Sequence, residues 1–145
     1  MTGSAMTDIT RLSMAETRSA IAERRLSAGE ITRHFLDRIA ASQPVLSGFT
    51  MVDEAGARAG AEAIDRKARR GDRLGVLAGV TVSVKDIIDV AGLATTNCSR
   101  SCLDRKAAHD AAVVARLRSA DAVILGKANC HEFAFGGPAF DLPFP

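Results

Sequence analysis

Two short apolar segments separated by a long connection most strongly limit what this chain can fold into. Residues 80–84 (VTVSV) and 122–126 (AVILG) are rich in β-branched side chains, which favour strands. Between them, Asp110 is expected to cap a helix that runs through Leu117 and ends by Asp121. A strand, a helical crossover and a second strand form the unit of a parallel sheet, so the segments predict two parallel strands.

Two Ser-x-x-Glu tetrapeptides, residues 13–16 and 27–30, precede apolar residues at helical spacing. In such a capping box the serine and glutamate side chains each accept a hydrogen bond from the other residue's backbone N–H. Each tetrapeptide therefore predicts the start of a helix. We expect the first helix to end near Arg25 and the second near Ser42, because the residue before Pro44 is biased away from helical conformation.

A third helix is expected over residues 53–70, which are rich in Ala, Glu, Lys and Arg. The preceding residues 49–52 form a short apolar stretch. The fold class is therefore α/β, with helices first. Residues 1–8 have the composition of a loose leader, and residues 133–145 contain no element that would close a domain. We expect the 145 residues to be the N-terminal portion of one larger domain whose C-terminal remainder is absent.

The composition excludes several other classes of protein. A hydrophobic fraction of 47% and a charged fraction of 25% are typical of soluble globular proteins. A net charge of +2, with no Tyr and no Trp, argues against a nucleic-acid surface. No apolar run approaches the roughly 20 residues of a membrane span. The three cysteines (98, 102 and 130) suit free thiols in a reducing compartment, with Cys130 buried, so we expect a cytoplasmic protein.

Three stretches in order along the chain carry a family resemblance. They are residues 75–86 (GVLAGVTVSVKD), residues 89–96 (DVAGLATT), and residues 122–129 (AVILGKAN) followed by 131–136 (HEFAFG). At these residues the chain resembles the amidase signature family. That family includes bacterial amidases, the glutamyl-tRNA amidotransferase component of amidase type and fatty acid amide hydrolase. The chain departs from the family pattern at Val76 and Thr81, where the family often has proline.

The resemblance implies an amide C–N hydrolase with a mixed sheet covered by helices and with no metal or organic cofactor. Its mechanism is of the Ser–cis-Ser–Lys type, in which Lys85 matches the catalytic lysine. The neutral amine relays a proton through a serine on a cis peptide bond and so activates the nucleophilic serine. That serine attacks the amide carbonyl, ammonia or an amine leaves, and water hydrolyses the acyl-enzyme. In the family, the Gly/Ser-rich segment with both serines lies beyond the point that corresponds to residue 145. We therefore expect the chain alone to be inactive.

Lys85 also suits a base on physical grounds. It lies at the carboxyl end of a strand, where α/β sheets bind ligands, and alternation places Ser83 on the same face. A lysine amine acts as a base only where burial lowers its pKa from about 10.4 toward neutrality, so we expect a buried amine. One alternative is a solvated lysine paired with Asp86. Another is a Ser83–Lys85 dyad, although alternate strand residues lie about 6.5–7 Å apart at Cα, which is long for proton transfer.

Other polar residues have more modest expected roles. Thr95 and Thr96 are the loop candidates for approaching substrate, although loop hydroxyls commonly bond to their own backbone. A zinc site would need ligands from the set Cys98, Cys102, His109, Cys130 and His131. Adjacent side chains rarely converge on one ion, so no metal is expected. His131 and Glu132 are expected to orient their backbone. The basic residues within 66–73 are expected to form a solvated helix end.

The sequence thus favours an amidase acting on a small-molecule amide within a longer parent protein, without nucleic acid or membrane. The candidate assemblies are a homo-oligomer and an amidotransferase-like complex. The alternatives are a non-catalytic small α/β binding module and a silent truncated product. A chain ending in a capping element would favour the binding module, and residues 140–145 do not have that pattern.

Overall fold

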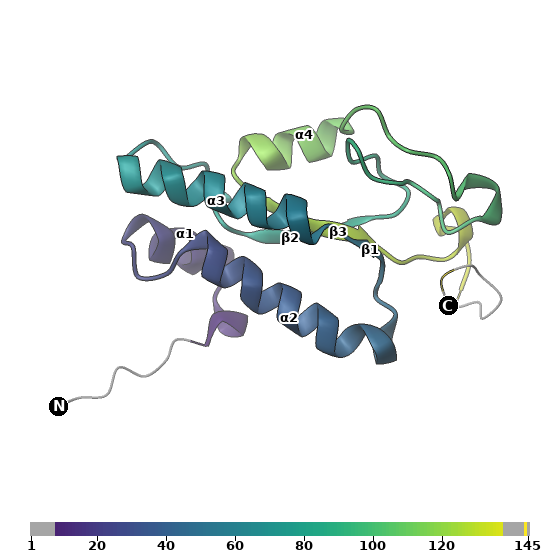
Figure 1. The fold of residues 1–145 in the computed structure, drawn as a ribbon, viewed down its shortest axis with the longest axis horizontal. Coiled ribbons are helices and arrows are strands. Elements are labelled where there is room, and N and C mark those ends of the chain that lie inside the picture. The colour runs from purple at the N-terminus through teal and green to yellow at the C-terminus, as the bar shows by residue number, and fades with distance from the viewer. Residues whose placement is uncertain (1–7, 138–143, 145) are drawn as a thin grey trace.

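The structure is a computed structural model that describes residues 8–137 and residue 144. Its helices are α1 (Met14–Ala22), α2 (Ala28–Leu46), α3 (Glu54–Arg70) and α4 (Ala112–Ser119), and its strands are β1 (Phe49–Val52), β2 (Thr81–Lys85) and β3 (Val123–Ala128) (Figure 1). Short 3₁₀ turns occupy Ile9–Arg11, Arg100–Cys102 and Glu132–Ala134. Of the helices in the described ranges, none combines the length and hydrophobicity that crossing a bilayer requires.

Both capping boxes form, so the predicted starts of the first two helices are confirmed. In α1 the Ser13 side chain accepts from the Glu16 N–H while the Glu16 carboxylate accepts from the Ser13 N–H, and Ser27 and Glu30 repeat this exchange in α2. The leader expected over residues 1–8 falls outside the described residues except for Asp8. The Asp8 side chain caps the first 3₁₀ turn.

Helix α2 continues through Pro44 to Leu46, so the expected end near Ser42 is wrong. Pro44 lies in the last turn, where its missing N–H removes a single intrahelical bond from a long helix. The helix ends instead at Ser47, which adopts a left-handed conformation and donates its N–H to the Gln43 carbonyl. The Gln43 side chain then bonds to both the N–H and the carbonyl of Phe49, which fixes the turn into β1.

The three strands form one mixed sheet in the order β1-β3-β2. Strands β2 and β3 are parallel, as their sequences predict, while β1 pairs antiparallel with β3. The sequence identifies residues 49–52 only as an apolar stretch, and the structure makes them a strand. Four residues are too few to show a clear alternation, and the strand exists because β3 offers a partner. No strand pairs with the outer edge of β2 within the described residues.

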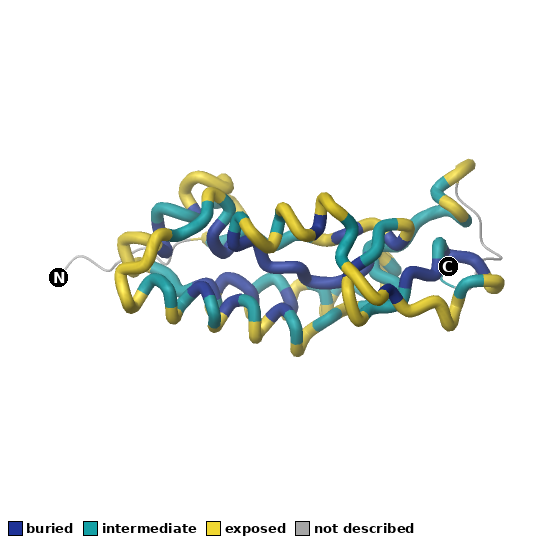
Figure 2. Tube along the Cα trace, turned by 90° about the horizontal axis from the view of Figure 1, so that it is seen from above, coloured by how far each residue is buried: buried dark blue, intermediate teal, exposed yellow. Residues whose placement is uncertain are grey.

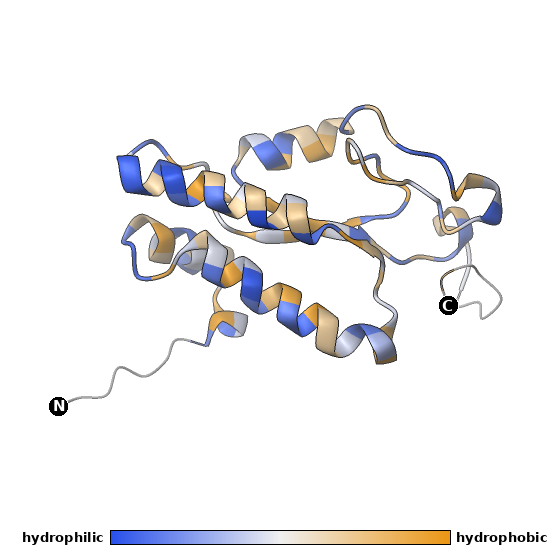
Figure 3. Ribbon diagram, in the orientation of Figure 1, coloured by the Kyte–Doolittle hydropathy of each residue, from blue (hydrophilic) through white to orange (hydrophobic). Residues whose placement is uncertain are grey.

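Helices cover both faces of this sheet. On one face α1, α2 and α3 pack around Val123 and Leu125 of β3, and on the other Val114 of α4 packs against Val84 and Ile124. Figure 2 shows the consequence, with buried positions along the strands and exposed positions on the outer helix turns. In Figure 3, orange hydrophobic positions interrupt the blue hydrophilic ones along the helices. Covered faces explain why the central strand is apolar throughout its first half.

Helix α4 begins differently from the expectation. Its N-cap is Ala111, which makes no side-chain cap, so the cap expected at Asp110 is wrong. The Asp110 carboxylate instead accepts from the Ala91 N–H and pairs with Arg118. Those two contacts connect the long crossover to the helix, so the carboxylate is used in tertiary rather than local bonding.

Strand β3 contains an irregular point at Gly126. The register between β2 and β3 shifts between Val82 and Ser83, and Gly126 has a φ of 151°. A Cβ at Gly126 would lie 2.2 Å from the carbonyl oxygen of Met51 in β1. Only glycine allows the two backbones to approach this closely. The strand continues beyond the predicted end at Gly126 to Ala128 and thereby includes Lys127.

Candidate active site

Lys85 is the last residue of β2, at the carboxyl edge of the parallel pair. Alternation leaves Ser83 and Lys85 exposed and turns Val84 and Asp86 into the interior. No hydrogen bond or ion pair joins the Lys85 side chain to another described residue. The amine was expected to be buried, but within the described residues it is exposed, because no described element covers this end of the strand face.

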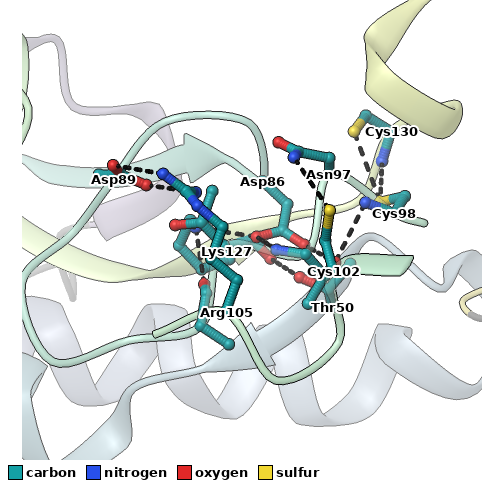
Figure 4. Close-up of polar contacts among 12 residues, drawn as sticks. Thr50, Asp86, Asp89, Asn97, Cys98, Cys102, Arg105, Lys127 and Cys130 are labelled. Carbon is teal, nitrogen blue, oxygen red and sulfur yellow. Dashed lines mark hydrogen bonds and ion pairs between the residues drawn. The ribbon is translucent and has the colours of Figure 1, made fainter. Parts of the chain in front are cut away.

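The alternative in which Asp86 is the partner of Lys85 is wrong. Asp86 is completely buried, and its Oδ1 lies 2.8 Å from the Nζ of Lys127, which is also completely buried. Figure 4 shows the two side chains meeting beneath the end of the sheet. The ion pair therefore crosses from β3 to the residue that follows β2, while Lys85 points to the other face.

All three N–H donors of the Lys127 ammonium have acceptors. Besides Asp86, the Ala94 carbonyl accepts at 2.8 Å and the Thr95 hydroxyl at 3.0 Å. Sequence analysis assigned no role to Lys127. The available signal was a lysine directly after an apolar strand core, since a buried ammonium requires a carboxylate partner.

The loop after β2 is fastened to the same ion pair. The Thr96 hydroxyl donates to Asp86 Oδ2, and the Asn97 N–H donates to the Asp86 carbonyl at 3.0 Å. Thr95 and Thr96 are both buried, with their hydroxyls engaged by Lys127 and Asp86. Among the described residues they hold the loop to the strand end, and their approach to substrate stays a prediction.

A surface ion pair supports the far side of this loop. The Arg105 guanidinium contacts both carboxylate oxygens of Asp89, at 2.8 and 2.9 Å. These bonds, with a further one from the Thr95 hydroxyl, lower the pKa of Asp89 below its ordinary value. Because the Arg105 carbonyl also accepts the Thr95 N–H, the return of the loop is connected to its outgoing segment.

The remaining candidates do not form a second site. Ser83 makes no hydrogen bond with Lys85. His131 places Nδ1 3.3 Å from the Glu132 carbonyl oxygen, next to its own backbone. Within residues 8–137, no group of three or more His, Cys, Asp or Glu could hold a metal ion. Cys98 is the buried cysteine, whereas Cys130 is only half-buried, which corrects the expectation for Cys130.

The basic cluster of residues 66–73 differs in part from a purely solvated helix end. Lys67 makes an ion pair of 2.6 Å with the buried Asp121, whose other oxygen accepts the Gly75 N–H. A pocket of about 450 Å³ lies beside this pair. It sits at the amino ends of β2 and β3, opposite the edge where Lys85 lies and where ligands of parallel sheets bind.

Comparison with known proteins agrees with this arrangement. The family model described as Amidase matches residues 30–140. The glutamyl-tRNA(Gln) amidotransferase chain of this type from Roseiflexus castenholzii is 44% identical over 139 residues, which are 96% of this chain and 28% of that protein. The corresponding protein of Streptomyces coelicolor is 44% identical over 131 residues, covering 90% and 26%. The chain thus spans little more than a quarter of the length of these relatives.

Solved structures give the same picture of the fold. An inhibitor-bound complex, described as vestigial and linked to the origins of an s-triazine catabolic enzyme, matches with a TM-score of 0.83 and 36% identity. That match covers 86% of this chain and 28% of the other. Native peptide amidase from Stenotrophomonas maltophilia matches with a TM-score of 0.81 and 31% identity, covering 87% and 26%. The family match spans most of the chain and the fold agrees with it, so this chain belongs to the amidase signature family.

Proposed function

We propose that this chain supplies the lysine base of an amide-hydrolysing active site of the Ser–cis-Ser–Lys type. In this proposal Lys85 takes the proton of a bridging serine, which in turn deprotonates the nucleophilic serine. Both serines would come from residues beyond position 145. A serine hydroxyl attacks an amide only when a positioned base removes its proton, so the function requires an amine that is free to accept one.

The observation that carries the proposal is the division of labour between two lysines. Lys127 neutralises Asp86 in the interior, so the carboxylate next to Lys85 in sequence is not available to hold the Lys85 side chain as a salt bridge. Lys85 is left on the open face of β2 without a partner among the described residues. That face and the unpaired outer edge of β2 are where additional chain would bury the amine and bring the serines to it.

The proposed substrate class is a carboxamide, because a C–N bond next to a carbonyl is the feature that the mechanism requires. The curated relatives include amidotransferase chains, while the solved relatives include a peptide amidase and an aryl acylamidase. We therefore extend to this protein the bond that is broken and leave the acyl group open. The longer protein would act in the cytoplasm, as a homo-oligomer or in an amidotransferase-like complex, and the 145 residues alone would not turn over amides.

The test is amide hydrolysis by the longer protein that contains these residues. Lys85→Ala should lower kcat by at least about 100-fold, the lower end of the range for general acid–base catalysis. Lys85→Arg should fail similarly, because a guanidinium keeps its proton. The matched control is Lys106→Ala, which removes an exposed lysine from the neighbouring loop and should leave kcat unchanged. Unchanged turnover in Lys85→Ala would refute the role of this lysine. A reading frame that encodes no Gly/Ser-rich segment after codon 145 would refute the proposed origin of the serines.

A further inference from the structure

Two of the three cysteines meet next to the strand ends. Cys98 lies in the loop after β2 and Cys130 follows β3, and their sulfur atoms are 3.4 Å apart (Figure 4). Cys98 is completely buried, whereas Cys130 is half-buried. The third cysteine, Cys102, contacts Asn97 and Ser101 instead. The fold therefore selects one pair of thiols that are 32 positions apart in sequence.

The surroundings hold these two thiols in different states. The Cys130 thiol donates to the Cys98 sulfur, while the Cys98 thiol donates to Asn129 Oδ1 at 3.3 Å. The backbone N–H of Cys130 also points at the Cys98 sulfur, at 3.3 Å. Burial raises the pKa of the Cys98 thiol to about 12. Cys98 is therefore held as a protonated thiol beneath the more accessible Cys130.

We propose that Cys98 and Cys130 form a dithiol site that a two-electron thiol oxidant such as hydrogen peroxide converts into a disulfide. Cys130 reacts first because it is the accessible sulfur. Its thiolate attacks one peroxide oxygen, the O–O bond breaks, and the departing hydroxide takes up a proton to become water. The resulting sulfenic acid is then attacked by the Cys98 sulfur, so the S–S bond forms and the S–O bond breaks. A second water leaves with the Cys98 proton, and the two thiols have lost two electrons and two protons.

The bond would tie together the two segments that flank the end of β2. The Cys98 loop is bonded to Asp86 through the Asn97 N–H, and the Cys130 segment follows Ala128, whose carbonyl accepts the Asp86 N–H. A disulfide across them would fasten the residues around Lys85 without using Lys85 itself. The inference stands on the two thiols alone and is independent of the proposed amidase mechanism.

The experiment maps the disulfide formed when the reduced, folded chain is treated with hydrogen peroxide. Trypsin cleaves after Arg100 and Lys127, which places the three cysteines in three different peptides. After alkylation of the remaining thiols, mass spectrometry should find the Cys98 and Cys130 peptides linked. The matched variant Cys102→Ser should give the same linked peptide, and Cys130→Ser should abolish it.

The unfolded chain provides the reference for this experiment. In denaturant the short loop between Cys98 and Cys102 has the lowest closure cost, so that pair should dominate. A change of partner from Cys102 to Cys130 on folding is the expected result. The proposal would be overturned if the folded chain gave the denatured distribution, linked only Cys102, or kept Cys98 and Cys130 as free thiols under peroxide that oxidises Cys102.

Discussion

Each N–H of the Lys127 ammonium has its own acceptor, and the carboxylate of Asp86 is neutralised in a site without water-exposed surface. Such a pair is costly to break, because removing one partner strands the other charge in the interior. The end of β2 is therefore held in place by charges that never reach the surface. The direction of Lys85 depends on this support, since Asp86 is the next residue.

Replacing Lys127 with Met should lower the free energy of unfolding by about 3–5 kcal/mol, because Asp86 then remains buried without a counter-charge. Adding Asp86→Leu should recover much of that loss by removing the stranded carboxylate. Urea unfolding of the single and double variants measures both effects. A double variant no more stable than Lys127→Met would contradict the assignment of the cost to the unpaired charge.

Gly126→Ala should destabilise the chain by about 1–3 kcal/mol, the usual cost of a strained backbone position. The added Cβ would meet the Met51 carbonyl oxygen at 2.2 Å. Gly60→Ala is the matched control, because a Cβ there in the middle of α3 has no heavy atom within 4 Å. It should stabilise the helix by roughly 0.5–1 kcal/mol. Thermal unfolding of the two variants should shift the melting temperature in opposite directions.

At this scale the sequence predicts the position of Lys85 but not its environment. Alternation along β2 places Lys85 opposite Val84, and that placement is correct. The pairing of Asp86 with Lys127 depends on the register of two strands separated by a long connection, which no local pattern encodes. The same holds for the meeting of Cys98 and Cys130. Contacts between distant segments follow from the sheet, and only their chemistry is visible beforehand.

Among the elements, the first two helices depend on their capping boxes for their start points. Hydrogen bonds from Ser27 lower the pKa of Glu30, and bonds from Ser13 do the same for Glu16. A carboxylate whose pKa is lower in the folded state stabilises the fold at pH values above its unfolded pKa. That contribution is lost as the pH falls through the folded value. Both helix starts should therefore weaken in acid.

Glu30→Gln tests this at α2. The glutamine side chain still accepts the Ser27 N–H, so the helix start remains, but it does not titrate. We expect the wild-type chain to lose stability as the pH falls below about 4.5, and the variant to lose less over the same interval. Urea unfolding across pH 3 to 6, in steps of about half a unit, provides the comparison. Identical pH dependence in the two chains would show that the capping carboxylate is not the group that titrates.

Elements with local signals were predictable, and elements formed by tertiary partners were not. The serine–glutamate pairs fix the starts of α1 and α2, and the β-branched runs fix β2 and β3. Strand β1 has only four residues and forms because β3 lies beside it. Pro44 and Asp110 mislead for the same reason, because a helix turn and a carboxylate answer to tertiary contacts as well as to local preference.

The whole molecule presents apolar side chains to solvent at several places. Val45 and Leu46 at the end of α2 are largely exposed, and Phe135 after β3 is 86% exposed. The outer edge of β2 also lacks a strand partner among the described residues. An open edge and exposed apolar side chains both favour association between copies.

The isolated 145-residue chain should therefore self-associate and bind a hydrophobic dye. Sedimentation at several protein concentrations measures the first property, and dye fluorescence measures the second. Phe135→Ser with Leu46→Ser should reduce both without changing the helical content. A wild-type chain that is monomeric at all concentrations and binds no dye would contradict the interpretation of this surface.

The most direct measurement of the central claim is the rate at which an organofluorophosphonate labels the active serine of the longer protein. This reagent reports the nucleophilicity of the serine without requiring knowledge of the substrate. If Lys85 is the base, Lys85→Ala should be labelled at least about 100-fold more slowly, while Lys106→Ala is labelled at the wild-type rate and the label maps beyond residue 145. Equal labelling of the wild-type protein and Lys85→Ala would contradict the role of Lys85 as the base.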